Sequence, residues 1–425
     1  SVTLTIDRFI QETAHREIEK AVALHNARQG SVIVMEVKTG RILAMAKSPG
    51  FDLNRYHSYP PFALRNFGFI DSFEPGSTLK IISLAAMLQH RPSVAGNRYR
   101  CRGYIDIADV RINCTGEHGT IDMKDVIRHS CNVGIIEAMR GIKKKEFHAT
   151  LGGFRFGRKT DVELPGESEG IMRPLKKWSG LSKYSIAIGQ EISVTSVQLA
   201  AAVSAIANGG VYITPSIIES IEEHDGTVVR RFAPLVKGRV LSREISKTVI
   251  GMMRGAVERG TGRNAWSPHY CVAGKTGTSQ KFVRARGYSD RVLSSFIGVA
   301  PCDDPAVCIL VVIDDPADKL SGGRIAAPVF GKLIDRVLVR QGVGGPRLKP
   351  GKPVTMPAVK AAFDGKTMPD FTGKRLPESL GLLIEMKRAF RTGYVIRGTG
   401  RVHAQRPAPG VPLAEGGEVI LFFIE

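Results

Sequence analysis

The segment KIISLAAML, from Lys80 to Leu88, places one lysine among almost wholly apolar residues. Pro75 and Gly76 end a loop just before it. A helix that is apolar around its whole circumference belongs inside a protein. We therefore expect a buried helix over residues 76–90 with Lys80 in its first turns, so the fold must take a lysine into its interior.

Ser77 lies three residues before Lys80 and shares its helix face. A serine hydroxyl is a poor nucleophile until a base removes its proton. Lysine can be that base only when neutral, and burial or a second cation lowers its pKa from about 10.4. The helix N-terminus also offers N–H groups to an anion that forms beside Ser77. The alternative interpretation is a helix cap followed by a surface lysine.

Two further motifs follow along the chain. Ser130-Cys131-Asn132 lies in HSCNVG, and a Lys-Thr-Gly-Thr run lies at 275–278 in VAGKTGTSQ. The first could be a polar break in a helical region. The second is not a phosphate-binding loop, because the glycine required four residues before Gly-Lys is missing. Ser-x-x-Lys, Ser-x-Asn and Lys-Thr-Gly in this order are the signature of penicillin-binding proteins and serine β-lactamases.

The chain resembles the class B penicillin-binding proteins, the monofunctional transpeptidases of division and sporulation. The segments GQEISVTSVQLAAAVSAIANGGVYITP, GTGRNAW and FIGVAPCDDPAVCILVVIDDP extend the likeness over nearly all of residues 1–340. Cys131 stands where β-lactamases usually carry aspartate, which weighs against a β-lactamase. The tail, with MPDFTG and RTGYVIRGTGRVHAQRPAPG, resembles a single PASTA repeat.

The resemblance implies a role for each catalytic residue. Ser77 attacks a peptide carbonyl and becomes the acyl-enzyme, and Lys80 accepts its proton. Ser130 passes that proton to the leaving amine, since a hydroxyl both donates and accepts. Asn132 holds the substrate amide. Lys275 keeps Lys80 neutral and polarises Ser130.

The same resemblance implies a substrate-binding strand that includes Thr276, Gly277 and Thr278. Gly277 lets a substrate backbone approach the strand. Thr278 binds the substrate carboxylate, and its N–H forms an oxyanion hole with that of Ser77. Strict strand alternation points Lys275 and Thr278 to opposite faces. We therefore expect a twist or bulge at Gly277 that brings both to one groove.

The function implied is a D,D-transpeptidase that cross-links peptidoglycan stem peptides ending in D-Ala-D-Ala and is inhibited by β-lactams. One alternative is a β-lactam-hydrolysing enzyme that uses Glu163, Glu167 or Glu169 as base, although a polar loop is favoured there. Another is a β-lactam sensor or division scaffold. The expected partners are stem peptides, β-lactams, and division or elongation membrane proteins such as a glycosyltransferase. The expected location is the extracytoplasmic face of the bacterial membrane, with the anchor and pedestal of the family absent from this chain.

The order of predicted elements indicates an α+β fold of the penicillin-binding and β-lactamase type, an antiparallel sheet with helices packed around it. Two strands joined by a hairpin come early, helices lie in the middle, and three strands come late. The predicted strands are 31–37, 41–47, 270–280, 293–301 and 306–316, and the predicted helices are 76–90, 122–140 and 193–208. We expect a transpeptidase domain over 1–340, a Gly/Pro/Lys-rich linker over 341–366 and a small αβ PASTA-like domain over 367–425. No run of eighteen apolar residues occurs, and the helical pattern at the start suggests a mature fragment.

The formal net charge of +20 raises the question of a nucleic-acid partner. Its basic residues are spread along the chain without interleaved aromatics, which favours a solvated surface facing an anionic polymer or lipid headgroups. The six cysteines lack zinc-finger spacing. Cys101 with Cys114 and Cys302 with Cys308 are candidate disulfides, and six reduced thiols are the alternative. A catalytic role for His118 or His129 is not favoured, because the serine–lysine chemistry needs no histidine base, and both are interpreted as structural. Metal ligation is not expected, since no carboxylate or thiol completes a recognisable set. No cofactor is expected.

Overall fold

The computed structural model describes residues 1–425 apart from 284–286, 345–365, 375, 398–399 and 425. The chain divides into two compact units, Ser1–Pro346 and Arg347–Glu425. Most of the predicted linker at 341–366 falls outside the described residues. Among the helices that the structure does describe, none is both long and apolar enough to cross a bilayer.

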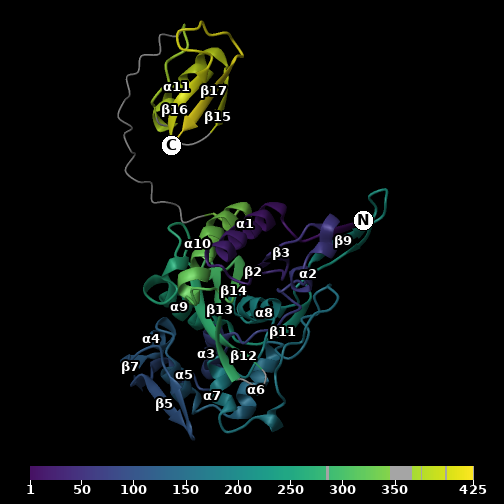
Figure 1. Ribbon diagram of the computed structural model, residues 1–425, viewed down its shortest axis with the longest axis vertical. Helices are drawn as coiled ribbons and strands as arrows, with labels where there is room; N and C mark the ends of the chain where they lie inside the picture. The colour runs from purple at the N-terminus through teal and green to yellow at the C-terminus, as the bar shows by residue number, and fades with distance from the viewer. Residues whose placement is uncertain (284–286, 345–365, 375, 398–399, 425) are drawn as a thin grey trace. The chain divides into compact units, whose positions relative to one another are not determined.

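A five-stranded antiparallel sheet forms the centre of unit 1 (Figure 1). Its strand order is β12-β13-β14-β2-β3, and each neighbouring pair is antiparallel. The strands are β2 (Gln29–Glu36), β3 (Ile42–Ser48), β12 (Ala273–Val283), β13 (Gly287–Ala300) and β14 (Val307–Asp314). The predicted α+β class is confirmed, and β12, which carries the Lys-Thr-Gly motif, lies at an edge of this sheet.

Helices cover both faces of the sheet, because successive side chains of its central strands point to opposite faces and are apolar on each. On β14, Ile309, Val311 and Ile313 pack with α1 (Arg8–Leu24) and α10 (Gly322–Arg340), which contact each other. Leu310 and Val312 on the other face join the larger core around α3 (Lys80–His90) and α8 (Ser196–Ala207). A strand buried on both sides is thus continuously hydrophobic, as the run AVCILVVI in the sequence shows.

A mainly helical region packs beyond β12 (Figure 1). Its helices are η2 (Gly76–Leu79), α3, α4 (Met123–Arg128), α5 (Asn132–Met139), α6 (Lys144–Gly153) and α7 (Ser182–Ala187). It also contains two short strand pairs. In one, β4 (Arg98–Cys101) pairs with β7 (Gly119–Asp122), and in the other, β5 (Tyr104–Ile107) pairs with β6 (Val110–Asn113). The prediction of one helix over 122–140 is wrong. The helix breaks at residues 129–131, because Ser130 has a left-handed backbone with φ 58°.

The remaining elements of unit 1 surround this framework. They are β1 (Val2–Leu4), η1 (Leu53–Ser58), α2 (Pro61–Leu64), η3 (Pro92–Gly96), η4 (Leu175–Lys177), β8 (Val211–Ile213), β9 (Ile218–Glu222), β10 (Val228–Arg231), β11 (Val236–Arg239), α9 (Arg243–Arg259) and η5 (Arg263–Ala265).

Unit 2 is a small αβ unit with a core of its own. Helix α11 (Leu376–Phe390) precedes β15 (Gly393–Arg397), β16 (Arg401–Arg406) and β17 (Glu418–Ile424). The strand order is β15-β17-β16, with β15 and β17 parallel. Its buried side chains include Phe371, Met386 and Leu421.

Both candidate disulfides are wrong. The structure pairs Cys271 with Cys302, and Cys101, Cys114, Cys131 and Cys308 are free. Cys271 lies just before β12 and Cys302 just after β13, so the disulfide closes the open end of that hairpin. Cys308 lies within β14, where its buried side chain faces α8 rather than Cys302.

Candidate active site

The three motifs meet at one cavity of about 330 Å³. Ser77, Ser130, Asn132, Thr276 and Thr278 all line it. These residues come from η2, from the break before α5 and the first residue of that helix, and from the edge strand β12. The fold therefore brings together segments that lie up to about two hundred residues apart in the sequence.

Ser77 and Lys80 stand where a 3₁₀ turn becomes a helix. Residues three apart eclipse each other in 3₁₀ geometry, so both side chains leave η2 on the same side. Ser77 is half-buried at the cavity, whereas Lys80 is fully buried. No hydrogen bond joins the Ser77 hydroxyl to the Lys80 amine in the structure. Among the described residues the Ser77 hydroxyl has no hydrogen-bond partner, and the Lys80 amine is bonded elsewhere.

The Lys80 amine is held by the second motif. Its Nζ donates to the Ser130 carbonyl oxygen at 2.5 Å and to Asn132 Oδ1 at 2.6 Å, and it lies 3.3 Å from Ser130 Oγ. The left-handed backbone of Ser130 turns its carbonyl toward the lysine, which accounts for a conformation that a serine rarely adopts. Strain at this residue is thus offset by the bonds of a buried amine.

The third motif reaches the same hydroxyl from the other side. Lys275 Nζ donates to Ser130 Oγ at 2.8 Å and to the Thr276 carbonyl oxygen at 3.0 Å. Ser130 Oγ therefore lies between two buried lysine amines. A hydroxyl in this position can accept a proton from one amine while it donates its own to a substrate.

Burial favours the neutral form of both lysines. It lowers the pKa of Lys80 to about 8. The pKa of Lys275 is lowered as well, first by burial and then by repulsion from Lys80. We expected the second cation to keep Lys80 neutral, but the pKa of Lys80 is lowered by its removal from water, and the repulsion between the two amines lowers the pKa of Lys275 instead. A fraction of Lys80 is accordingly a free base near neutral pH.

The predicted bulge at Gly277 is absent. Residues Ala273 to Gln280 pair with β13 in unbroken register, and the register shifts only after Gln280. The fully buried Lys275 side chain reaches Ser130 Oγ from this regular strand, so no bulge is needed. Thr276 and Thr278 lie two apart on one face and line the cavity together.

The structure requires glycine at position 277 for a different reason from the one expected. A Cβ there would lie 2.3 Å from Ser295 Oγ and 2.9 Å from Thr78 Cγ2. Gly277 is thus buried between β13 and η2 and does not line the cavity. Its lack of a side chain lets the nucleophile-bearing turn approach the strand.

Several cavity residues were missed by the sequence motifs. Thr261 Oγ1 lies 2.9 Å from Thr276 Oγ1 and extends the hydroxyl-lined wall. The other lining side chains that the motifs did not predict are Thr115, Ile188, Gln190, Ser279, Gln280 and Ser321, with His129 beside Ser130. Thr261 lies in GTGRNAW, a segment that carries part of the family likeness. That likeness was the only feature of the sequence that could have indicated Thr261 as a site residue.

The three glutamates considered for hydrolysis do not line the cavity. Glu163 accepts hydrogen bonds from Ser216 Oγ and the Ile217 N–H. Glu167 is buried and accepts from the Thr160 hydroxyl and N–H. Glu169 is exposed. Glu163 and Glu167 stabilise loops through these hydrogen bonds, which agrees with the polar-loop interpretation.

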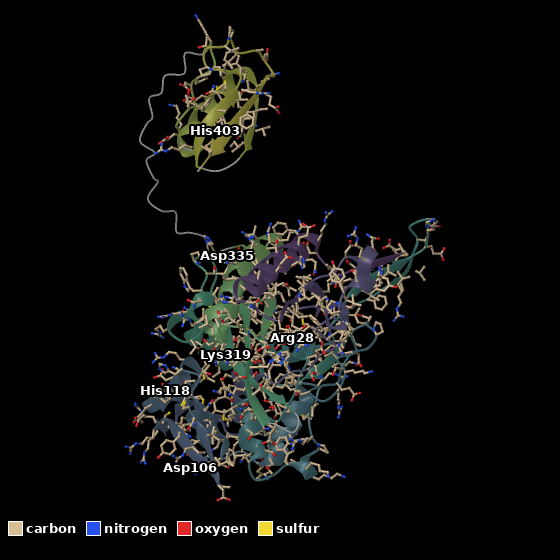
Figure 2. All side chains as sticks on the ribbon, in the orientation of Figure 1. Arg28, Asp106, His118, Lys319, Asp335 and His403 are labelled. Atoms are coloured by element: carbon tan, nitrogen blue, oxygen red, sulfur yellow. A yellow bond between two sulfur atoms is a disulfide. The ribbon has the colours of Figure 1, made fainter. Side chains whose placement is uncertain are left out.

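Three cysteines surround His118 beside the second motif. His118 lies next to β7 in the same helical region (Figures 1 and 2). Cys101, Cys114 and Cys131 place their sulfur atoms so that these and a His118 ring nitrogen all lie within 4.8 Å of one another. The expectation that no thiol stands with this histidine is wrong, because residues far apart in sequence converge here.

The motif geometry agrees with the likeness to known proteins. The profile of the penicillin binding protein transpeptidase domain matches residues 30–335. Stage V sporulation protein D of Bacillus subtilis is 33% identical over 99% of this chain and 65% of its own length. The chain belongs to the class B penicillin-binding protein transpeptidases.

Other members of this class are similarly close. Peptidoglycan D,D-transpeptidase FtsI of Escherichia coli is 32% identical over 80% of this chain and 56% of its own length. The crystal structure of penicillin-binding protein 3 from Mycobacterium tuberculosis, complexed with aztreonam, superposes with a TM-score of 0.75 at 32% identity, covering 81% of this chain and 80% of that one. The chain spans 65% and 56% of the two curated class B relatives.

Proposed function

We propose that this protein is a peptidoglycan D,D-transpeptidase that acts through a Ser77 acyl-enzyme and is acylated and inhibited by β-lactams. The observation that carries the proposal is the position of Ser130 Oγ between the buried amines of Lys80 and Lys275, beside a half-buried Ser77 in one cavity. The named activity of the FtsI relative and the aztreonam complex of the mycobacterial protein support it.

Acylation uses the neutral Lys80 as base. Ser77 Oγ attacks the carbonyl of the penultimate D-Ala, the new C–O bond forms, and the serine proton passes to Lys80. When the tetrahedral intermediate collapses, the peptide C–N bond breaks. Ser130 hands its proton to the leaving D-Ala amine and is re-protonated from Lys80, so the protons balance.

Transfer completes the reaction. The amine of a neighbouring stem peptide attacks the ester carbonyl, its proton returns through Ser130 and Lys80 to Ser77, and the cross-link is released. A β-lactam enters the same first step, but its leaving amine stays tethered to the acyl group, so transfer is blocked.

Substrate binding falls to β12 and the second motif. The hydroxyls of Thr276 and Thr278 share one face and suit the terminal carboxylate, with Lys275 behind them. Asn132 Nδ2 donates to the Asn113 carbonyl and its Oδ1 accepts from Lys80, which fixes the amide that would hold the substrate. The N–H groups of Ser77 and Thr278 are the proposed oxyanion hole.

Hydrolysis and sensing are the less favoured alternatives. A hydrolase needs a base that activates water at the acyl-enzyme, and the three candidate glutamates lie outside the cavity wall. A sensor would be acylated but would show no transfer to an amine. The assay described below separates these outcomes.

Two features of the chain bear on the proposed setting. The Cys271–Cys302 disulfide suits an oxidising, extracytoplasmic location. Unit 2, with its αβ core and a relative that matches 99% of the chain, is proposed as a PASTA-like domain. It either binds cell wall or packs on a neighbour. Division or elongation membrane proteins, including a glycosyltransferase, are the proposed partners.

The proposal is tested by cross-linking a synthetic stem peptide ending in D-Ala-D-Ala to an amine acceptor, with released D-Ala and cross-linked product both quantified. We expect both products from the wild type and neither from Ser77→Ala. D-Ala release without cross-linking, or rapid turnover of a chromogenic cephalosporin, would contradict transpeptidation and favour a hydrolase.

A further inference from the structure

The cysteine cluster around His118 has the dimensions of a closed zinc site. Cys114 Sγ lies 3.7 Å from Cys131 Sγ, and His118 Nδ1 lies 3.4 Å from Cys101 Sγ and 3.7 Å from Cys114 Sγ. A tetrahedral zinc with Zn–S of about 2.3 Å and Zn–N of about 2.0 Å separates two sulfurs by about 3.8 Å and sulfur from nitrogen by about 3.6 Å. Three of the six separations among the four ligand atoms thus match such a tetrahedron, and all four atoms lie within 4.8 Å of one another.

We propose that Cys101, Cys114, His118 and Cys131 bind one zinc ion that holds the Ser-x-Asn motif in place. Three soft sulfur ligands and an imidazole select zinc over the hard cations. Four protein ligands fill a tetrahedral shell, so the ion is structural and takes no part in the chemistry. The spacing Cys-x12-Cys-x3-His-x12-Cys is not a zinc-finger pattern, which is why the sequence did not reveal it.

Neighbouring backbone groups support thiolate ligands. The Asn132 N–H donates to Cys114 Sγ at 3.2 Å, and the Gly134 N–H donates to Cys131 Sγ at 3.3 Å. Hydrogen bonds of this kind orient the ligands of a metal from outside its own shell. They come from the first residues of α5, so that helix is tied directly to the cluster.

The ligands join two short strand pairs to helix α5, and both pairs also place side chains such as Tyr99 and Ile105 in the core. Cys101 ends β4, Cys114 follows β6, His118 precedes β7, and Cys131 caps α5. The β4–β7 and β5–β6 pairs are two-stranded ladders of four residues each, and such ladders are marginal in water. A metal bound to both pairs and to α5 would add to the stability that this packing provides.

The site adjoins the catalytic residues. Cys131 lies between Ser130 and Asn132 in sequence, and the Asn113 carbonyl next to Cys114 accepts a hydrogen bond from Asn132. The cysteines are therefore positioning residues for the two groups that hold Lys80. This consequence rests on the proposed function, whereas zinc binding itself does not.

A bound metal would also explain how the cluster cysteines stay unpaired in the oxidising compartment proposed for this protein. In an oxidising environment two thiols 3.7 Å apart are prone to pair, yet Cys114 and Cys131 are free while Cys271 and Cys302 are joined. Coordination would keep all three thiolates of the cluster from oxidation.

Zinc content of the full chain, purified without chelator and under mild reductant, is the direct test. Elemental mass spectrometry should find about one zinc per chain in the wild type. Cys101→Ser and His118→Ala should lose zinc to a competing chelator at least about tenfold more readily. Cys308→Ala, which removes a buried thiol outside the cluster, should retain it.

Absence of zinc from the wild type, with none gained from one added equivalent, would overturn the site, as would full retention by both ligand variants. If those variants fail to fold, cobalt added to the metal-free wild type gives a second reading. Intense tetrahedral thiolate bands support the ligand set, and weak octahedral bands overturn it.

The positioning role is tested on the wild type alone. Stripping the metal should slow acylation by a fluorescent penicillin at least about tenfold, and added zinc should restore it. An unchanged rate would overturn the positioning role. A protein that binds zinc but is never acylated would instead contradict the proposed function and leave the metal site standing.

Discussion

At the scale of single residues, the account depends on a lysine that is neutral because it is buried. Lys80 donates to two oxygens of the second motif and is wholly removed from water. The Ser77 hydroxyl makes no hydrogen bond within the described chain, so it is free to meet a substrate carbonyl. Proton transfer to Lys80 then requires Ser77 Oγ and Lys80 Nζ to come within hydrogen-bond distance of each other.

The rate of acylation should rise with pH. Lys80 can accept a proton only when neutral, and its pKa is lowered to about 8. Below that pH the amine is charged and acylation slows about tenfold per pH unit, whereas above it the rate levels off. Stopped-flow acylation by a fluorescent penicillin from about pH 6 to pH 10 measures this, and a rate that stays flat or falls would contradict a neutral-lysine base.

The sequence could predict the motif residues because each motif is a short run with its own chemical logic. It could not place Thr261 beside Thr276, or the three cysteines around His118, because those contacts join segments far apart in the chain. The missing Ser77–Lys80 bond was equally out of reach, since it depends on where the Ser130 carbonyl points.

At the scale of elements, the turn that carries Ser77 is held by close backbone packing. The Gly76 N–H donates to the Gly189 carbonyl, and Gly189 has φ +87°. A Cβ at Gly189 would lie 2.0 Å from the Gly76 carbonyl oxygen. The loop after α7 and the nucleophile turn therefore fit together only while residue 189 is glycine.

Gly189→Ala should lower the free energy of unfolding by at least about 2 kcal/mol and slow acylation, because the new methyl group clashes with backbone and the residue is strained. Urea unfolding and acylation rates measure the two effects. Gly152→Ala in α6 is the matched control, since a Cβ there meets nothing within 4 Å. Equal behaviour of the two variants would contradict the packing argument.

The Cys271–Cys302 disulfide should stabilise unit 1. It spans a separation of 31 residues, for which chain-entropy arguments give about 3 to 4 kcal/mol. The double variant Cys271→Ala/Cys302→Ala should unfold at lower urea, as followed by the fluorescence of Trp178 and Trp266. An unchanged midpoint, with Cys308→Ala as reference, would show that the disulfide adds nothing.

The central strands were predictable because long apolar or alternating runs have few other interpretations. The break at residues 129–131 was not, because the left-handed Ser130 is stabilised by Lys80, a tertiary contact that local propensity cannot foresee. The expected bulge failed for a related reason. Alternation along β12 was foreseen, but the position of Ser130 within reach of the Lys275 amine was not.

At the scale of the whole molecule, every residue of the cavity belongs to unit 1. Unit 2 has a separate core. The catalytic chemistry should therefore be complete without the tail, while any affinity for cell wall that resides in the tail should be lost with it.

A chain ending at Pro346 should be acylated by penicillin within about twofold of the full-length rate, because no cavity residue is removed. Acylation kinetics of the two chains give the comparison, and a large loss of rate would show that the tail supports the site. Peptidoglycan pull-down of the same pair tests wall binding, since unchanged binding would remove that role from residues 367–425.

The central claim is that Ser77 is the nucleophile activated by a buried lysine pair. Intact mass spectrometry after penicillin tests it most directly, on the wild type, on Ser77→Ala and on Ser83→Ala, whose parent hydroxyl lies on α3 and donates to Ala187. We predict one added drug mass on the wild type and Ser83→Ala and none on Ser77→Ala. An adduct on Ser77→Ala, or none on the wild type, would contradict the account.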